Sequence, residues 1–175
     1  NNSNWREIDV TKFRGSDYAS GKHTFKITGD GISIFPRLRP NKYNQSFEEQ
    51  VLSSGIDGID KLLNGGIEKG TTSILIGASG AGKTNLGLQF IKEAASRGER
   101  STLYTFEESK ELIMRRSEKI NTSIRDIINN GMLKIESVEP LSYSPDEFSK
   151  MVRREVEEND TQLVMIDAIG GYSMA

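Results

Sequence analysis

The run GASGAGKT, residues 77–84, indicates the fold of this chain. It follows the apolar residues ILI and matches the pattern G-x-x-x-x-G-K-[ST] at every position. Glycines let the backbone turn tightly and point amide N–H groups at phosphate oxygens, and the helix that follows adds the partial positive charge of its amino terminus. The run therefore predicts a phosphate-binding loop between a buried strand, residues 71–76, and an amphipathic helix.

The residue types in this loop predict ATP and Mg²⁺ as its ligands. Lys83 supplies a positive charge for the β- and γ-phosphates, and the Thr84 hydroxyl is suited to coordinate Mg²⁺. A glycine-rich turn without a ligand is the alternative, and the flanking strand and helix disfavour it. The predicted ATP-binding residues are Gly77, Ala78, Ser79, Gly80, Ala81, Gly82, Lys83, Thr84 and Asn85.

A second candidate site is the apolar run LVMI that ends at Asp167. Four apolar residues followed by an aspartate are typical of the Walker B motif, in which the carboxylate at the end of a strand helps to hold Mg²⁺. An aspartate here is also a common turn residue or helix cap. Because a phosphate loop is also present, we favour the metal role and expect Thr84 and Asp167 to bind the metal. The lack of alternation predicts that residues 162–166 are buried on both faces.

Two adjacent carboxylates, Glu107 and Glu108, follow the apolar run STLYTF. A parallel strand delivers its last residues to the ligand edge of the sheet, so either carboxylate could orient or deprotonate the nucleophile that attacks the γ-phosphate. The alternative is that the two glutamates have no catalytic role and are favoured by the dipole of the next helix. The residues alone do not decide between a catalytic and a structural role. Adjacent side chains on a strand face opposite ways, so we expect only one to act as the base.

Strand and helix signals alternate from about residue 53 onward, which predicts an α/β fold with a mostly parallel sheet and helices on both faces. The clearest helix start is Ser144 as N-cap, Pro145 in the first turn and Glu147 as the second half of a capping box. The amino-terminal part differs. Residues 23–35 alternate around a Gly-Asp-Gly turn and predict a β-hairpin with His23 on its surface, and a proline-containing linker follows.

The composition limits the partners. The formal net charge is −2 and 27% of the residues are charged, without the basic stripe that nucleic-acid binding usually needs, so nucleic acid is disfavoured. No apolar run approaches the ~20 residues of a membrane span, so no membrane is expected. The amino-terminal residues lack the features of an export signal, which favours the cytoplasm. The absence of cysteine excludes thiolate metal sites.

On these residues the sequence resembles the KaiC family of RecA-like ATPases, over nearly the whole chain. Residues 54–84 look like the opening of a family domain, and FEES, residues 106–109, resembles the segment that supplies its catalytic glutamates. KFRGSDY and FKITGDGISIFPRL resemble the end of a preceding family domain. The resemblance implies residues 1–40 as the end of one domain, 41–52 as a linker, and 53–175 as a RecA-like ATPase domain that stops after Walker B. We therefore expect a longer, two-domain protein.

The resemblance also implies roles for individual residues. In the family the first glutamate of the pair is the principal base, which favours Glu107 with Glu108 assisting. Lys12 and Arg14 match a lysine and an arginine that reach into the nucleotide of the neighbouring subunit. Their spacing would place both on one face of a strand, although composition alone favours a surface charge pair. Tyr18 stands where the family often has histidine.

These observations predict a Mg²⁺-dependent ATPase of KaiC type with a regulatory or clock-like role. Resemblance alone implies a homo-oligomer in the form of a hexameric ring, regulatory protein partners and serine/threonine autokinase activity. One alternative is a RecA/RadA-like DNA recombination ATPase, which the lack of a basic stripe disfavours. The other is a signalling switch that binds ATP and hydrolyses little of it, which the intact Lys83, Thr84 and Glu107 disfavour.

Overall fold

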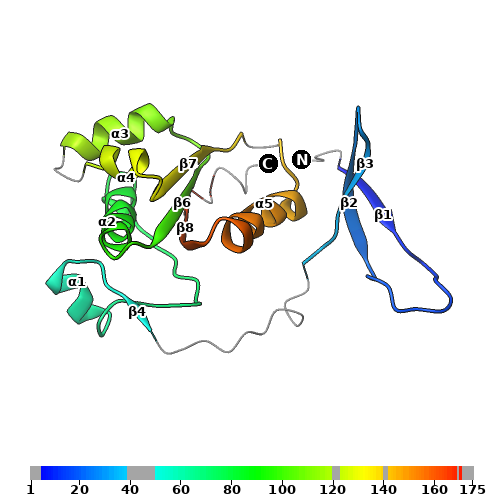
Figure 1. Cartoon of the computed structure of the whole chain (residues 1–175), viewed down its shortest axis with the longest axis horizontal. Helices are drawn as coiled ribbons and strands as arrows, with labels where there is room; N and C mark the ends of the chain where they lie inside the picture. Colours follow the sequence, from blue (N-terminus) through cyan, green and yellow to red (C-terminus); the bar gives the residue numbers. More distant parts are fainter. Residues whose placement is uncertain (1–4, 39–49, 120–122, 140–141, 169, 171–175) are drawn as a thin grey trace.

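The computed structural model of the chain describes residues 5–38, 50–119, 123–139, 142–168 and 170. An antiparallel sheet at the amino-terminal end stands beside an α/β body that is built around a parallel sheet (Figure 1). A two-stranded ribbon and a short helix lie at the edge of that body. The core of the predicted linker, residues 41–49, lies outside the described residues.

The parallel sheet has the strand order β7-β6-β8, and both of its strand pairs are parallel. Its strands are β6 (Arg100–Thr105), β7 (Leu133–Ser137) and β8 (Thr161–Asp167). The helices of the body are α2 (Lys83–Ser96), α3 (Lys110–Lys119), α4 (Arg125–Asn129) and α5 (Pro145–Glu158). The predicted alternation and the parallel sheet that it implies are confirmed.

Helices cover both faces of this sheet, as predicted. Adjacent residues of a strand point to opposite faces, and Leu103 and Tyr104 of β6 lie in two different apolar clusters. Leu103 packs with side chains of α2 and α3, including Leu88 and Ile113, on one face. Tyr104 packs against Phe148 of α5 on the other, with ring centroids 5.2 Å apart. β6 is therefore the buried centre of the body.

The strand expected at residues 71–76 is not formed, so that prediction was wrong. Residues 72–78 have no regular secondary structure, and Ile74 and Ile76 are 69% and 92% exposed. An apolar run becomes a strand only where a neighbouring strand accepts its backbone hydrogen bonds. In the described part of the chain β8 pairs with β6 alone, which leaves β8 at the edge of the sheet. The predicted burial of β8 on both faces is wrong for the same reason, because Ile166 is exposed and Val164 is half-buried.

A small substructure precedes the phosphate loop. It contains β4 (Val51–Leu52), α1 (Asp57–Leu62) and β5 (Ile67–Glu68), with β4 and β5 antiparallel. The Asp60 carboxylate accepts hydrogen bonds from the Ser53 hydroxyl at 2.6 Å and the Ser54 amide at 2.8 Å, which lowers its pKa. Gln89 of α2 donates to the Ser54 carbonyl at 3.1 Å. These bonds fasten the substructure to α2.

The amino-terminal sheet consists of β1 (Arg6–Asp9), β2 (Lys22–Thr28) and β3 (Gly31–Phe35) in antiparallel order. The predicted hairpin is confirmed, since Thr28 pairs with Gly31 across a two-residue turn. His23, predicted on the strand surface, is buried, with 5% of its surface exposed. Its Nδ1 accepts from the Arg37 amide at 3.1 Å, so Nε2 carries the proton and donates to the Ala19 carbonyl at 2.9 Å. Two backbone partners thus account for its burial.

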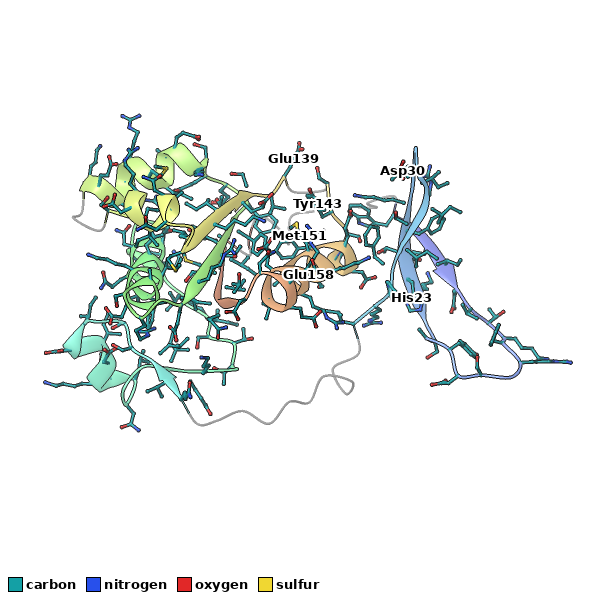
Figure 2. All side chains as sticks on the ribbon, viewed as in Figure 1. His23, Asp30, Glu139, Tyr143, Met151 and Glu158 are labelled. Atoms are coloured by element: carbon teal, nitrogen blue, oxygen red, sulfur yellow. The ribbon has the colours of Figure 1, made fainter. Side chains whose placement is uncertain are left out.

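The amino-terminal sheet lies against the start of α5 (Figure 1), and side chains from both elements meet between them (Figure 2). The Thr24 and Ser144 hydroxyls are 2.8 Å apart, and Lys26 donates to the Glu147 carboxylate at 2.8 Å. The Lys26 ammonium also lies 5.1 Å from the centroid of the Tyr143 ring. Ser144 accepts from the Glu147 amide at 3.2 Å, which confirms the N-cap. The Glu147 side chain is engaged by Lys26, and a bond from it that would complete the predicted capping box is not seen in the described residues.

The Lys26–Glu147 pair predicts a measurable coupling between hairpin and helix. In a double-mutant cycle with Lys26→Ala and Glu147→Ala, we expect about 0.5–1 kcal/mol of interaction free energy in urea unfolding. The value stays modest because the Lys26 side chain is 36% exposed. The comparison is the Lys22–Glu7 pair, which joins β2 to β1 within the amino-terminal sheet and is 70% and 43% exposed, so its coupling should be smaller. An absent coupling in the Lys26–Glu147 cycle would contradict docking through Lys26.

Candidate active site

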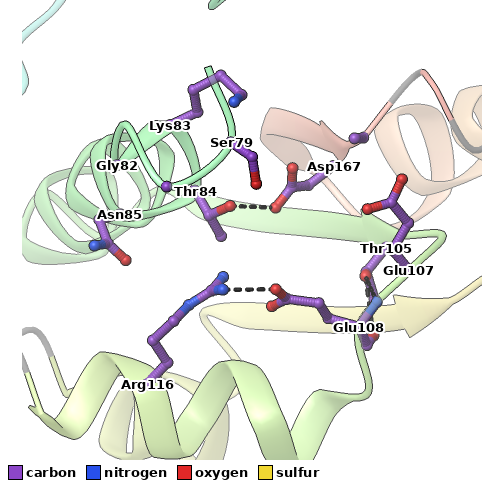
Figure 3. Close-up of a pocket in the computed structure, with 12 residues that line it drawn as sticks. Ser79, Gly82, Lys83, Thr84, Asn85, Thr105, Glu107, Glu108, Arg116 and Asp167 are labelled. Atoms are coloured by element: carbon purple, nitrogen blue, oxygen red, sulfur yellow. Dashed lines mark hydrogen bonds and ion pairs between the residues drawn. The ribbon is translucent and has the colours of Figure 1, made fainter. Parts of the chain in front are cut away.

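A cleft opens at the carboxyl-terminal edge of the parallel sheet, where the phosphate loop, the end of β6 and the end of β8 meet (Figure 3). Its volume is about 260 Å³. Parallel sheets commonly bind ligands at this edge. The cleft brings together predicted site residues from three segments, namely Ser79, Gly80, Gly82, Lys83, Thr84 and Asn85, then Glu107 and Glu108, then Asp167.

The phosphate loop has the backbone that the glycine pattern predicts. Gly80 and Gly82 have φ of 80° and 89°, left-handed values that strain any residue with a side chain. Gly82 is the N-cap of α2, so the loop leads directly into the helix amino terminus. The Lys83 ammonium lies across the loop and donates to the carbonyls of Gly77 and Ala78, each at 2.9 Å. Those two residues and Ala81 shape the loop without lining the cleft.

A hydrogen bond joins the two predicted metal residues. The Thr84 hydroxyl at the start of α2 donates to the Asp167 carboxylate at the end of β8, at 2.7 Å (Figure 3). Both side chains offer oxygen atoms, which Mg²⁺ prefers. No group of three or more Asp, Glu, His or Cys side chains in the described ranges forms a denser metal site. Mg²⁺ here would complete its coordination with water and phosphate oxygens, as it usually does.

Gly87 allows this contact and was missed by the sequence analysis. It lies one helical turn beyond Thr84, and a Cβ atom on it would lie 2.5 Å from the Met165 sulfur of β8. The missing side chain lets α2 approach β8 closely, and a larger residue would have to displace the end of Met165. A glycine within a helical pattern was the available signal, since glycine is costly there unless packing requires it.

The two glutamates after β6 have different surroundings. Glu108 forms a salt bridge with Arg116 of α3 at 2.6 Å, and its amide donates to the Thr105 hydroxyl at 3.2 Å. Glu107 is exposed, lines the cleft and has no hydrogen-bond or ion-pair partner within the described ranges. Arg116 also lines the cleft and was not predicted. A basic residue in the helix after the acidic pair was its only sequence signal.

Several buried polar atoms near the cleft lack protein partners among the described residues. They are the Asn85 Oδ1, the Glu108 Oε2, and the Nε and Nη2 of Arg116. A buried polar atom without a hydrogen bond costs about 1–3 kcal/mol, so such atoms are satisfied by water or a ligand. A polar ligand in the cleft would supply hydrogen bonds that these atoms lack.

Lys12 and Arg14 are placed differently from the expectation. Both are exposed and lie in the loop between β1 and β2, not in a strand, so the argument that they share one strand face was wrong. That loop is at the far end of the amino-terminal sheet from the body that holds the cleft (Figure 1). The structure therefore does not bring them to the cleft of their own chain. Tyr18 lies in the same loop.

Comparison with known proteins identifies relatives. The family model "ATPase: KaiC" matches residues 52–175. The circadian clock oscillator protein KaiC of Picosynechococcus sp. is 32% identical over 168 residues, which cover 96% of this chain and 32% of the relative. The KaiC 1 protein of Synechocystis sp. is 30% identical with the same coverage. The chain thus spans about 32% of the length of these relatives. No helix within the described residues is long and apolar enough to cross a membrane.

Proposed function

Since this chain belongs to the KaiC family of ATPases, we propose that its cleft binds ATP with Mg²⁺ and hydrolyses the γ-phosphate. The observation that carries the proposal is the Thr84–Asp167 hydrogen bond, because it joins the phosphate loop to the Walker B strand in one cleft. Lys83 and Glu107 line the same cleft, and the Glu107 carboxylate has no protein partner among the described residues. This is the set of groups that phosphoryl transfer requires, namely a cation, metal ligands and a carboxylate.

Each residue has a defined part in the proposed reaction. Lys83 exchanges its carbonyl partners for the β- and γ-phosphates, and the glycine amides bind phosphate oxygens. Thr84 and Asp167 would hold Mg²⁺, which would neutralise charge on those phosphates. Glu107 orients a water molecule and accepts its proton as the water oxygen attacks the γ-phosphorus. The bond to the β–γ bridging oxygen breaks, and ADP and phosphate leave.

The assembly is part of the proposal. We infer that residues 1–40 close a preceding domain of the same kind and that the protein forms a homo-oligomeric ring, as the family resemblance implies. Lys12 and Arg14 are exposed cations on a projecting loop and have no hydrogen-bond or ion-pair partner in the part of the chain that the structure describes. They are thus available to reach the nucleotide of a neighbouring subunit. The relatives are named circadian clock oscillator proteins, which favours a regulatory role.

The first prediction separates binding from chemistry. In the purified full-length protein, Lys83→Ala should abolish ATP binding and phosphate release at this cleft, which leaves only the activity of the preceding domain. Glu107→Gln should keep ATP binding at the cleft and lower its kcat by about 10²–10⁴-fold, because only proton transfer is lost. Lys92→Ala, an exposed lysine on α2, is the matched control and should behave as wild type. If phosphate release stays at the wild-type rate in both variants, the mechanism is wrong.

Radiolabel transfer from ATP to the protein would establish an autokinase as well.

The second prediction concerns the metal. Chelation with EDTA should stop phosphate release, and Mg²⁺ should restore it. Asp167→Asn and Thr84→Val should raise the Mg²⁺ concentration for half-maximal activity, whereas Thr84→Ser keeps the hydroxyl and should change it little. Asp160→Asn, at the opposite end of β8, is the control. An unchanged Mg²⁺ requirement in Asp167→Asn would remove this residue from the metal site.

The third prediction tests action between subunits. Because residues 1–40 are inferred to close a preceding domain, Lys12 and Arg14 would serve the nucleotide of that domain in the neighbouring subunit, whereas Glu107 serves the cleft described above. Lys12→Ala/Arg14→Ala should therefore remove one share of the phosphate release of the full-length protein, and Glu107→Gln the other. The combined variant should lose both shares, and Lys22→Ala, an exposed lysine of β2, is the matched control. A Lys12→Ala/Arg14→Ala protein with the wild-type rate would contradict the role between subunits.

A further inference from the structure

The Arg116–Glu108 salt bridge forms part of the wall of the cleft, immediately beside Glu107. The Nη1 of Arg116 donates to the Oε1 of Glu108 at 2.6 Å, and the two side chains are 35% and 28% exposed. Partly buried charge pairs resist screening by salt better than exposed ones. The bridge ties α3 to the segment that follows β6.

The main chain around Glu108 is held as well. The Thr105 hydroxyl donates to the Glu108 carbonyl at 2.9 Å and accepts from the Glu108 amide at 3.2 Å. Phe106 is buried, and its ring centroid is 5.5 Å from that of Phe148. Glu107 thus stands between two anchored neighbours while its own carboxylate stays free of protein partners among the described residues.

We propose that Arg116 is a positioning residue for hydrolysis, and this rests on the proposed ATPase function. Its salt bridge engages Glu108 and holds the turn after β6. Of the two adjacent glutamates, only Glu107 then presents an unengaged carboxylate to the nucleotide. Glu108 then fixes the backbone that carries the base, Glu107. Glu108 thus has a structural role and Glu107 a chemical one, a division of roles that the residues alone left open.

A direct contact between Arg116 and the phosphates is the rival role, because its Nε and Nη2 are buried without protein partners among the described residues. Two observations favour positioning. The Glu108 carboxylate already engages the guanidinium at 2.6 Å. In addition, Lys83 and Arg116 lie on opposite sides of the Thr84–Asp167 pair (Figure 3), so Arg116 is on the side away from the phosphate-loop lysine. The two roles predict different kinetics.

The test measures kcat, KM and the dissociation constant of a fluorescent ATP analogue in the purified full-length protein. Arg116→Ala and Glu108→Gln should each lower kcat by about 10- to 100-fold, as expected when a reacting group is misplaced. The analogue should bind within about twofold of wild type, since no phosphate contact is lost. Arg116→Lys should recover part of kcat. Arg115→Ala, an exposed neighbour on α3, is the matched control and should behave as wild type.

The double variant Glu108→Gln/Arg116→Ala gives the sharpest outcome. If both residues act through one bridge, kcat in the double variant falls no further than in the single variants. Losses that multiply, an Arg116→Ala protein with wild-type kcat, or a loss confined to ATP binding would each overturn the proposal. If Arg116→Ala does not fold, as judged by circular dichroism, Glu108→Gln and Arg116→Lys decide. Failure of the ATPase function itself would appear separately, as a wild-type protein without turnover.

Discussion

The hydrogen bond between Thr84 and Asp167 is the contact on which the organisation of the cleft depends. It joins the first turn of α2 to the last residue of β8, two segments far apart in the chain. Gly87, one turn further along α2, allows the close approach by presenting no side chain to Met165. Because the hydroxyl donates to the carboxylate, the two oxygens lie side by side. A hard divalent cation favours such an arrangement of oxygen donors.

Around that bond the cleft divides its charges by position. Lys83 lies on one side, held by two carbonyls of its own loop, and Arg116 lies on the other, engaged by Glu108. The first cation is bound to neutral acceptors, so an anionic phosphate competes well for it. The second is bound to a carboxylate, which a phosphate displaces less readily. Under the proposed function, Lys83 would capture a phosphate, whereas Arg116 would keep the wall of the cleft in place.

Sequence patterns predicted the features that depend on neighbours within a few residues. Examples are the tight turn at the glycines of the phosphate loop, the Ser144 cap and the turn of the hairpin. They failed where a distant partner decides the outcome. In the part of the chain that the structure describes, the run 71–76 has no strand beside it. Glu147 is engaged by Lys26 of β2, and the two ring nitrogens of His23 are occupied by backbone groups.

The cleft shows the same limit. The position of Asp167 after an apolar run predicted that it would lie at the edge of the sheet beside the phosphate loop, and it does. No local pattern could distinguish Glu107 from Glu108, because the difference comes from Arg116 on another element. The family resemblance ranked the pair, and the salt bridge now supplies a physical reason for the ranking.

Within the described residues one edge of β8 has no strand partner, and Ile74 and Ile76 are exposed, which has a practical consequence for the protein in solution. An open strand edge offers unpaired amides and carbonyls to any other polypeptide, and an apolar run rich in β-branched residues is a ready complement to it. Pairing of the exposed run with an open strand edge of another molecule is therefore the expected hazard at high protein concentration.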